Sequence, residues 1–372
     1  MSNTLRVGSP VYATSQGLGY LAKSFFDAGI ITNPLVVRHS SRTNHLEWYN
    51  SVPHSFCDPS NPGLLRRQLQ ALCRRIDVLL VFETPFDWSI IPYCKGIGVK
   101  TVITPMYECT PKDQLNHPYT HPQQPDLILN PSDLDQQYFP QGIRCHIPVE
   151  SDVINGYRER TTLTTFVHNA GHGGLKGRNG TAEVLRAWNY VRSPARLIIR
   201  SQKALPGVPS SRTEVFCPGG PRGTAADPRH GQTIEYKIGS VSRHELYAEG
   251  DCLLFPEKFN GLSLPLQEAY ASGMLVMATN RFPNSNWLPD EPLIPVKEYV
   301  QEQVSGRCYS FKSAVIDPEV LASHIDRWYG RDITAYSKAG LEFARNHSWD
   351  TLRPWYLKIL TDLVSGTTYR AT

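Results

Sequence analysis

The stretch that most constrains the fold of this 372-residue chain is residues 251–279, DCLLFPEKFNGLSLPLQEAYASGMLVMAT. Its apolar run at residues 252–255 stops at a proline, and residues 274–278 form a second apolar run, so both are typical of short strands buried on two faces. A loop and a short helix are expected between them. The signals for that helix are a capping residue, a proline in the first turn and a glycine for a left-handed end, at Ser263, Pro265 and Gly273.

The start of this helix favours an anion. Its unbonded amides at Gly261 to Leu264 and the positive end of its dipole point at one place. That place is the carboxyl edge of a parallel sheet, where ligands bind in open α/β folds. Glu268 follows one turn further in, where its carboxylate can accept hydrogen bonds from ribose hydroxyls. The residues predict a nucleoside diphosphate site; the alternative is an ordinary strand–helix turn with a solvated glutamate.

The string NGLSLPLQEAYASG resembles the donor-binding motif of family-4 glycosyltransferases of the GT-B fold, usually E-G-F-G-L-P-x-x-E-A-x-A-x-G. Aligned this way, Glu268 takes the place of the second glutamate, which in that family binds the donor ribose, and Gly261 and Leu262 lie in the donor loop. The first glutamate falls on Asn260, which can hydrogen-bond sugar hydroxyls but brings no charge to the reacting centre. Glu257 is the nearest substitute carboxylate, although the register argues against it.

Length and composition set the broad class. A chain of 372 residues can form two domains, and 40% hydrophobic with 19% charged residues is typical of a globular protein. No apolar run approaches the ~20 residues needed to cross a bilayer, and the first residues lack the pattern of a signal peptide. Eight cysteines without a CxxC pair favour reduced thiols and a cytoplasmic location. The net charge of +4 suits a protein that handles phosphorylated donors.

The first half of the chain opens with an expected strand at residues 5–13 and a helix that starts with Gly17 and Gly19. This G-x-G-x-x-A loop allows a backbone to approach a phosphate closely. One alternative is the dinucleotide site of an NADP oxidoreductase, with Arg38 after the second strand. In the family that the chain resembles, a glycine loop in this place faces the donor phosphates, so both glycines are assigned to donor binding.

Three polar side chains follow buried strands in the same half. Glu83 comes after the expected strand at residues 76–82, and Tyr107 and Glu108 come shortly after the one at residues 100–104. Because the carboxyl ends of parallel strands meet at one edge, we expect all three on the acceptor side of the site. The alternative for each is a surface or capping role. Residues 39–62 are polar and rich in turn residues, which predicts a loop.

Two patterns raise the question of a metal ion. His117 and His121 have the spacing H-x-x-x-H, but a proline lies between them and disfavours a regular metal-binding helix face. Asp133 and Asp135 form a D-x-D, the metal signature of the other large glycosyltransferase fold. Because Ser132 precedes an amphipathic run here, helix capping is the preferred interpretation. We therefore expect neither a metal nor a cofactor.

A glycine-rich loop at residues 169–180 leads into the first helix expected in the second half of the chain. Many glycines beside Lys176 and Arg178 indicate close backbone approach to a negative group; the alternative is a solvated loop. The run resembles the basic motif of the same family, usually R-K-G. Arg178 and Gly180 match it, Asn179 replaces the lysine, and Lys176 is the candidate for the missing charge.

Two further segments complete the resemblance. The pattern S-x-x-E at Ser242 to Glu245 predicts a capping box that opens a helix, and this is the family's usual lead into the donor motif. The expected helix at residues 351–364 is similar to the family's last helix, which returns to the first domain. The resemblance is specific from about residue 163 to 279 and at the end, and only architectural over the first 150 residues.

These observations predict an α/β chain of two doubly wound Rossmann-like domains facing a cleft, the GT-B fold. The acceptor-side domain is expected at residues 1–155, the nucleotide-sugar donor domain at 156–349, and a helix that packs back on the first domain at 350–372. The resemblance implies a retaining, metal-independent hexosyltransferase that uses a UDP- or GDP-sugar. The catalytic candidates are Lys176, Arg178 and Asn260, of which the two cations would stabilise the departing diphosphate.

Several alternatives stay open at this point. A DNA glycosyltransferase acting on hydroxymethylated pyrimidine bases has partial support from the basic charge balance and from Arg66, Arg67, Arg74 and Arg75. A GT-B sugar-nucleotide epimerase would share the donor site, an NADP oxidoreductase would rely on Gly17 to Ala22, and a sensor would bind without turnover. The acceptor is open among glycans, small molecules, proteins and modified DNA.

Overall fold

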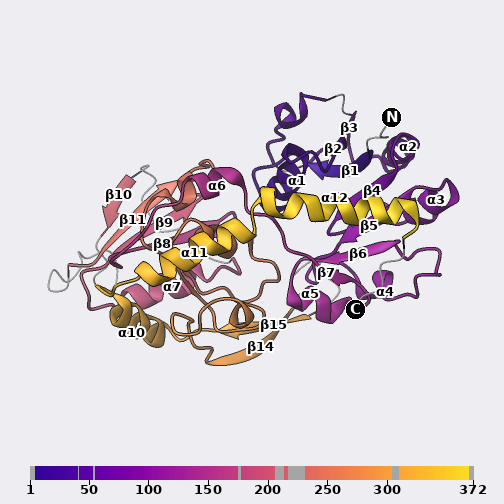
Figure 1. Ribbon diagram of the computed structural model, residues 1–372. Helices are drawn as coiled ribbons and strands as arrows, with labels where there is room; N and C mark the ends of the chain where they lie inside the picture. The colour runs from indigo at the N-terminus through magenta and orange to yellow at the C-terminus, as the bar shows by residue number, and fades with distance from the viewer. Residues whose placement is uncertain are drawn as a thin grey trace. The chain divides into compact units, whose positions relative to one another are not determined.

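The computed structural model describes residues 5–40, 42–52, 55–174, 177–205, 213–216, 231–303 and 310–367. The chain divides into two compact units. Unit 1 consists of Met1–Pro148 and Trp349–Thr372, and unit 2 of Val149–Ser348. Each unit is an α/β layer structure with its own sheet (Figure 1), so the predicted fold class of two Rossmann-like domains is confirmed.

The sheet of unit 1 has seven strands among the described residues, in the order β3-β2-β1-β4-β5-β6-β7, and all of its neighbours pair in parallel. The strand order reverses between β1 and β4, which makes this the switch point where ligands bind in such sheets. The strands are β1 Val7–Tyr12, β2 Asn33–Val37, β3 Ser55–Cys57, β4 Val78–Phe82, β5 Lys100–Thr104, β6 Leu127–Asn130 and β7 Ile143–Arg144.

Helices cover this sheet, and the last one comes from the far end of the chain. In α12, Trp349 Nε1 donates to Ser24 Oγ at 2.7 Å and the Tyr356 hydroxyl donates to His146 O at 2.6 Å. The Phe25 ring packs edge-on against both aromatic rings, with centroids 4.9 Å away in each case. The predicted return of the last helix to the first domain is therefore confirmed. The helices are α1 Gly17–Asp27, η1 Leu46–Tyr49, α2 Pro62–Cys73, α3 Ile90–Gly96, α4 Lys112–Leu115, α5 Asp133–Tyr138 and α12 Trp349–Ser365.

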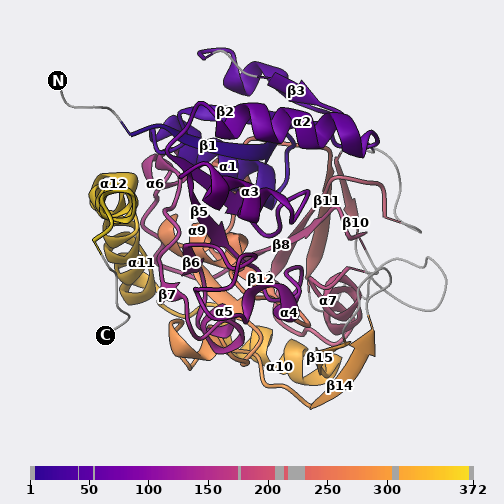
Figure 2. The same ribbon diagram turned by 90° about the vertical axis from the view of Figure 1, so that its right-hand side faces the viewer.

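The sheet of unit 2 has the order β10-β11-β9-β8-β12-β13, in which only the β10–β11 pair is antiparallel among the described strands. Figure 2 shows β10 beside β11 at one end of this sheet. Its switch point lies between β8 and β12. A separate two-stranded hairpin, β14–β15, follows later in the chain. The strands are β8 Thr165–Gly171, β9 Arg196–Ser201, β10 Thr213–Phe216, β11 Thr233–Ile238, β12 Cys252–Phe255, β13 Leu275–Ala278, β14 Glu298–Gln303 and β15 Ser310–Val315.

The two faces of this sheet are covered by different helices. On one face Phe166 of β8 packs in a cluster with residues of α7 and α10, and on the other face Val167 packs with Leu266 and Ala269 of α9. This alternation is the period of two that a strand imposes. The helices are α6 Ser151–Asn155, α7 Thr181–Trp188, α8 Glu245–Ala248, α9 Leu264–Ala271, η3 Asn284–Asn286, α10 Pro318–Trp328 and α11 Thr334–Asn346.

Helix α11 passes α9 in close approach. A Cβ at Gly340 would lie 2.1 Å from Tyr270 O, so only glycine fits at this crossing. Gly273 ends α9 in the left-handed conformation that the sequence predicts, with φ of 86°. Among the described residues, no helix is long and apolar enough to cross a membrane.

Candidate functional site

Helix α9 begins at the carboxyl edge of the sheet of unit 2, directly after the loop that leaves β12. Ser263 occupies its N-cap position, and Pro265 lies in its first turn as predicted. The prediction that the Ser263 side chain caps the helix is wrong. Ser263 has φ 48° and ψ 65°, and its side chain makes no capping hydrogen bond. A left-handed backbone is costly for a residue with a Cβ, and Ser263 Oγ is buried without a partner among the described residues.

The glycine-rich loop after β8 contacts the loop after β12. Lys258 N donates to Arg178 O at 2.7 Å, and the Arg178 guanidinium carbon lies 5.6 Å from the centroid of the Phe259 ring. Gly180 has φ 79°, and a Cβ there would lie 2.1 Å from Pro256 O. The structure therefore brings together the two motifs that the sequence singles out more than 70 residues apart. Lys176 lies outside the described residues.

Asn260, Gly261 and Leu262 are buried in the loop that precedes α9. The backbone of this loop is held by Arg281, whose Nη2 donates to Asn260 O. The Nη1 of the same guanidinium donates to Phe282 O at 2.7 Å, so one buried arginine ties the segment after β13 to the loop that precedes α9. The prediction of a catalytic role for the Asn260 side chain is not tested by these contacts.

Glu257 is the partner of this arginine. Its side chain is completely buried, and its Oε1 lies 3.5 Å from Arg281 Nε and accepts a hydrogen bond from Asn284. Burial raises the pKa of the Glu257 carboxyl, and the charge of Arg281 opposes that rise. The carboxylate therefore serves an internal ion pair.

Glu268 lies in the second turn of α9 and is 3% exposed. Its carboxylate forms an ion pair with Arg243 and accepts a hydrogen bond from the Tyr247 hydroxyl at 2.6 Å. A carboxylate can accept about four hydrogen bonds, so these partners fix its position and leave part of its capacity. Burial raises the pKa of the Tyr247 hydroxyl, which keeps this group a donor.

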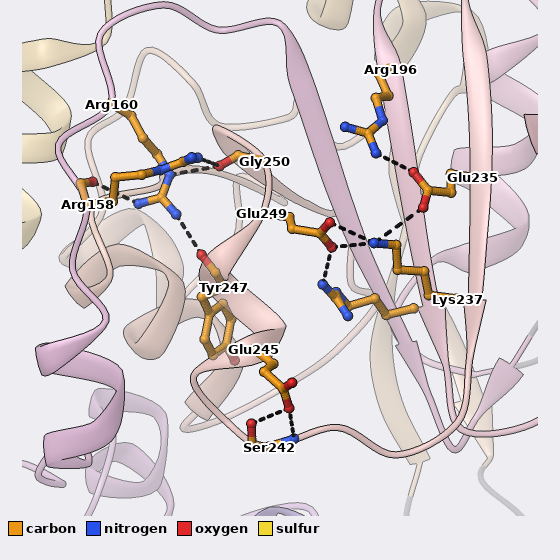
Figure 3. A network of polar contacts seen from close by, with 11 residues as sticks. Arg158, Arg160, Arg196, Glu235, Lys237, Ser242, Glu245, Tyr247, Glu249 and Gly250 are labelled. Carbon is orange, nitrogen blue, oxygen red and sulfur yellow. Dashed lines mark hydrogen bonds and ion pairs between the residues drawn. The ribbon is translucent and has the colours of Figure 1, made fainter. Parts of the chain in front are cut away.

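The approach to α8 differs from the prediction. Ser242 N donates to Glu245 Oε2, which is one of the two bonds of a capping box, but Ser242 Oγ donates to the same carboxylate oxygen. Helix α8 begins only at Glu245, so the pair closes the turn before the helix (Figure 3). The predicted capping box is therefore wrong: its two residues are bonded to each other, but they do not cap the helix.

Arg160 joins the ends of α8 and α9, and Figure 3 shows its bonds on the side of α8. It is 2% exposed, and its guanidinium donates to four backbone carbonyls. These are Gly250 O at 2.8 Å, Tyr247 O at 2.6 Å, Arg158 O at 3.0 Å and Ser272 O. Burial lowers the pKa of Arg160 to about 10, and the group remains charged at neutral pH. Because Tyr247 and Glu268 sit on the helices that it joins, Arg160 sets the position of both.

The carboxyl edge of unit 1 has a different character. Glu83 follows β4 at the switch point with φ 60°, a left-handed conformation that glutamate rarely adopts. Its amide donates to Thr104 O at 2.8 Å, and its carbonyl accepts from Thr110 Oγ1 at 2.7 Å. Both bonds hold it at the end of the neighbouring strand β5, so the outlier is fixed by its surroundings.

Tyr107 and Glu108 are buried at the same edge, with exposed fractions of 5% and 3%. Tyr107 N donates to Asp135 Oδ1 at 2.7 Å. Burial raises the pKa of Asp135 to about 7, and the charge of Glu108 adds to the rise. Ser132 accepts a hydrogen bond from Asp135 N at 3.1 Å, so the helix-capping interpretation of Ser132 is confirmed. Glu83, Tyr107 and Glu108 thus share one edge, and their acceptor role remains a prediction.

Of the two glycines at the start of α1, the second serves local packing. A Cβ at Gly19 would lie 2.1 Å from Thr14 O, so the second glycine lets the helix approach the loop that leaves β1. Gly17 is exposed at the first position of α1. Their assignment to the donor phosphates stays a prediction. Among the described residues, no group of three or more His, Cys, Asp or Glu is placed to hold a metal ion.

Several residues of this site have no signal in the sequence. Arg243 and Tyr247 reach Glu268 across a turn, and Arg281 reaches Asn260 from the next strand end. One pattern could have indicated the ion pair of Glu257: Arg281 lies close in sequence to the loop that carries this carboxylate. No spacing rule identifies the other contacts.

Comparison with solved structures identifies the fold. A sucrose-phosphate synthase from Thermosynechococcus elongatus matches with a TM-score of 0.58 at 12% identity, over 98% of this chain and 100% of its own. The catalytic domain of starch synthase IV from Arabidopsis thaliana, bound to ADP and acarbose, matches with 0.57 at 10% identity, over 98% and 100%. The trehalose-6-phosphate synthase OtsA matches with 0.58 at 10% identity, over 96% and 98%. These likenesses show the fold, which is the predicted GT-B fold.

The sequence itself adds no closer relationship. No protein-family model matches this chain, and a search of curated proteins found no match.

Proposed function

We propose that this chain is a GT-B glycosyltransferase that moves a sugar from a nucleoside diphosphate sugar, UDP- or GDP-linked, to a hydroxyl acceptor. The observation that carries the proposal is the contact between the two loops at the switch point of unit 2. Lys258 N bonded to Arg178 O places a guanidinium-bearing loop against the loop that opens α9. A cation and a helix N-terminus at one strand edge suit a diphosphate.

The chemistry follows from where charge grows. The bond between the sugar carbon and the diphosphate oxygen breaks, a bond to the acceptor oxygen forms, and the proton of the acceptor hydroxyl passes to the departing diphosphate. Negative charge therefore accumulates on the diphosphate in the transition state. Arg178 and the amides at the start of α9 stabilise that charge, and Lys176 is proposed to add to it. Retention of configuration is proposed from the resemblance to family 4, without a side-chain nucleophile and without a bound metal.

Glu268 is proposed to bind the donor ribose. Its position is fixed by Arg243 and Tyr247, so it can accept from a diol without reorganising. We expect Glu268→Gln to weaken binding of the nucleoside diphosphate by about 1.5 to 3 kcal/mol, the usual value for a hydrogen bond to a charged group. Glu245→Gln is the matched control, because Glu245 is an exposed acid on α8. Equal affinity for both variants and wild type, measured by calorimetric titration, removes Glu268 from the site.

The acceptor side is assigned to unit 1. Glu83 is its best candidate, because it is only partly buried and lies at the switch point, whereas Tyr107 and Glu108 are buried. A carboxylate at this place can accept a hydrogen bond from the acceptor hydroxyl. Glycans, small molecules, proteins and modified DNA all carry such hydroxyls, and the acceptor has to be found by experiment.

The decisive experiment uses purified protein, labelled UDP-glucose or GDP-mannose, and a panel of these acceptors. We expect release of UDP or GDP together with a mass increase of one hexose on one acceptor, unchanged by EDTA. The anomeric configuration of the product, read by NMR, tests retention. An isomerised donor without transfer would indicate the epimerase, hydride exchange with NADP the oxidoreductase, and binding without turnover the sensor. If neither donor binds, the proposed function is wrong.

A further inference from the structure

Asn169 lies at the switch point of unit 2, near the end of β8. Two residues earlier, Val167 packs against α9, while His168 donates to or accepts from Thr181 Oγ1 of α7 on the opposite face at 2.9 Å. By the alternation of a strand, Asn169 shares the face that α9 covers. Asn169 also lies closer to the edge of the sheet than Val167 does, because Val167 pairs with Leu253 and β12 ends two residues after Leu253. Its side chain therefore belongs to the edge where α9 begins.

The backbone around Asn169 departs from a regular strand. The register between β8 and β9 shifts after Asn169, which pairs with Arg200, while Gly171 pairs with Ser201. The Asn169 carbonyl accepts from Asn179 Nδ2 at 3.0 Å, so the next asparagine along the loop is committed to the backbone. Irregularities of this kind terminate pairing and re-aim a side chain beside binding sites.

The Asn169 amide is buried and unbonded. The residue is 8% exposed, and neither Oδ1 nor Nδ2 has a hydrogen-bond partner among the described residues. By contrast, the Nδ2 of the buried Asn130 at the end of β6 donates to Gln136 Oε1 at 2.9 Å and to Phe139 O at 2.8 Å, and only its Oδ1 is without a partner among the described residues. Two buried groups left without bonds disfavour folding, and such groups are retained where a ligand supplies the bonds.

The chemistry of the amide selects its ligand. Nδ2 donates and Oδ1 accepts, whereas a phosphate oxygen only accepts. A hydroxyl does both. We propose that Asn169 is a donor-binding residue that hydrogen-bonds hydroxyls of the nucleotide sugar, either on the ribose or on the transferred sugar. The buried Ser263 Oγ at the start of α9, likewise without a partner, is a second hydroxyl-compatible group on this edge. The inference rests on the proposed function and extends it to a residue outside both family motifs.

The test is Asn169→Leu, which replaces the amide with an apolar group of similar size. We expect its melting temperature to equal or exceed that of wild type, because the variant no longer buries two unbonded polar atoms. We also expect at least a tenfold higher Kd for UDP-glucose or GDP-mannose, whichever wild type binds. Asn130→Leu is the matched control and is expected to do the reverse, lowering the melting temperature with an unchanged Kd.

Separate titrations with UDP or GDP distinguish the two sources of hydroxyls. If affinity for the free diphosphate falls as much as affinity for its sugar conjugate, Asn169 binds the ribose; if only the conjugate is affected, it binds the transferred sugar. Asn169→Ser, smaller and still polar, is the second variant in case the leucine side chain does not fit.

Failure of this inference is distinct from failure of the proposed function. If wild type binds a sugar nucleotide and both Asn169 variants bind it equally well, Asn169 is structural and this inference alone is overturned. If wild type binds none of UDP, GDP and their sugar conjugates, the proposed function and this inference fall together.

Discussion

At the edge where its strands end, unit 1 gathers carboxyl groups, whereas unit 2 gathers amides, a guanidinium and the start of a helix. Unit 1 places Glu83 at its switch point with Glu108 and Asp135 buried close by. At its own edge unit 2 buries Glu257 and Glu268, and each has an arginine partner, Arg281 and Arg243 respectively. Two similar scaffolds thus place different polar groups at the same topological position.

The difference bears on the proposed function, which assigns a different ligand to each edge. A donor bound at unit 2 would place its diphosphate near the guanidinium of Arg178 and the start of α9, where the two buried acids are paired with arginines. A hydroxylated acceptor, proposed for unit 1, can donate a hydrogen bond to a carboxylate there. Four experiments test this contrast, beginning with the largest expected effect.

The largest loss of stability is expected when the charge of Arg281 is removed from unit 2. Arg281→Met leaves the Glu257 carboxylate buried without compensation, and we expect a loss of about 3 to 5 kcal/mol in the free energy of unfolding. The double variant Glu257→Gln with Arg281→Met removes both charges and should recover much of the loss. Denaturant titration of the single and double variants measures this. A single variant as stable as wild type would contradict a compensating role for Arg281.

Raising the pH should weaken unit 1. The pKa of Asp135 is about 7 in the folded chain, against 3.8 as its usual value. Between these two pKa values the folded chain keeps a proton that the unfolded chain releases. The stabilisation from this group is therefore complete below pH 3.8 and is lost as the pH rises through 7. The expected loss between pH 4 and pH 6.5 is about 3 kcal/mol, at 1.36 kcal/mol per pKa unit. Asp135→Asn should abolish this part of the pH dependence, as followed by denaturant titration at each pH.

Lowering the pH should weaken unit 2, the opposite direction. Burial lowers the pKa of His168 to about 4 from 6.5, and the neutral ring contacts Leu254 O at 2.8 Å and Thr181 Oγ1 at 2.9 Å. The unfolded chain binds the proton more tightly, so stability falls as the pH drops from 6.5 to 4, by about 2.5 kcal/mol. His168→Gln should be less stable at every pH but should flatten this slope. An unchanged slope would mean that another group titrates.

The smallest effect is expected at Asn260, where the motif of family-4 glycosyltransferases that the sequence resembles has a glutamate. If its side chain touches the transferred sugar through neutral hydrogen bonds, Asn260→Ala should cost about 0.5 to 1.5 kcal/mol in donor binding. Asn260→Glu should be tolerated or should change sugar preference. Melting temperature and sugar selectivity are measured on both variants. Lower melting with unaltered selectivity in both would make Asn260 a structural residue of the loop.

The buried strands were predictable because a short apolar run such as Cys252–Phe255 is typical of a strand inside a sheet. The strand β3, in contrast, lies within residues 39–62, where the sequence predicts a loop. It has three residues and is recognisable only by its pairing with β2, for example Phe56 with Val36. A sheet edge formed by tertiary pairing leaves no periodic pattern in so short a segment.

The candidate site was predictable in its motifs and not in its contacts. The Glu268 position and the glycine loop follow from local sequence, whereas Tyr247 reaches Glu268 from 21 residues away. Ser263 shows a second limit: its residue type predicts a cap, but the left-handed backbone prevents one. Backbone conformation and long-range partners are set by packing, which a single sequence does not state.

The division of the chain also bears on how the protein is made. Unit 1 needs Trp349 and Tyr356 against Phe25, yet the 200 residues of Val149–Ser348 are synthesised in between. At roughly 5 to 20 residues per second, translation of this insertion takes on the order of 10 to 40 s. Over that interval unit 2 can complete itself while the nascent unit 1 still exposes the apolar surface around Phe25. Unit 2, although it comes later in the sequence, is thus expected to finish folding before unit 1, which waits for the last helix.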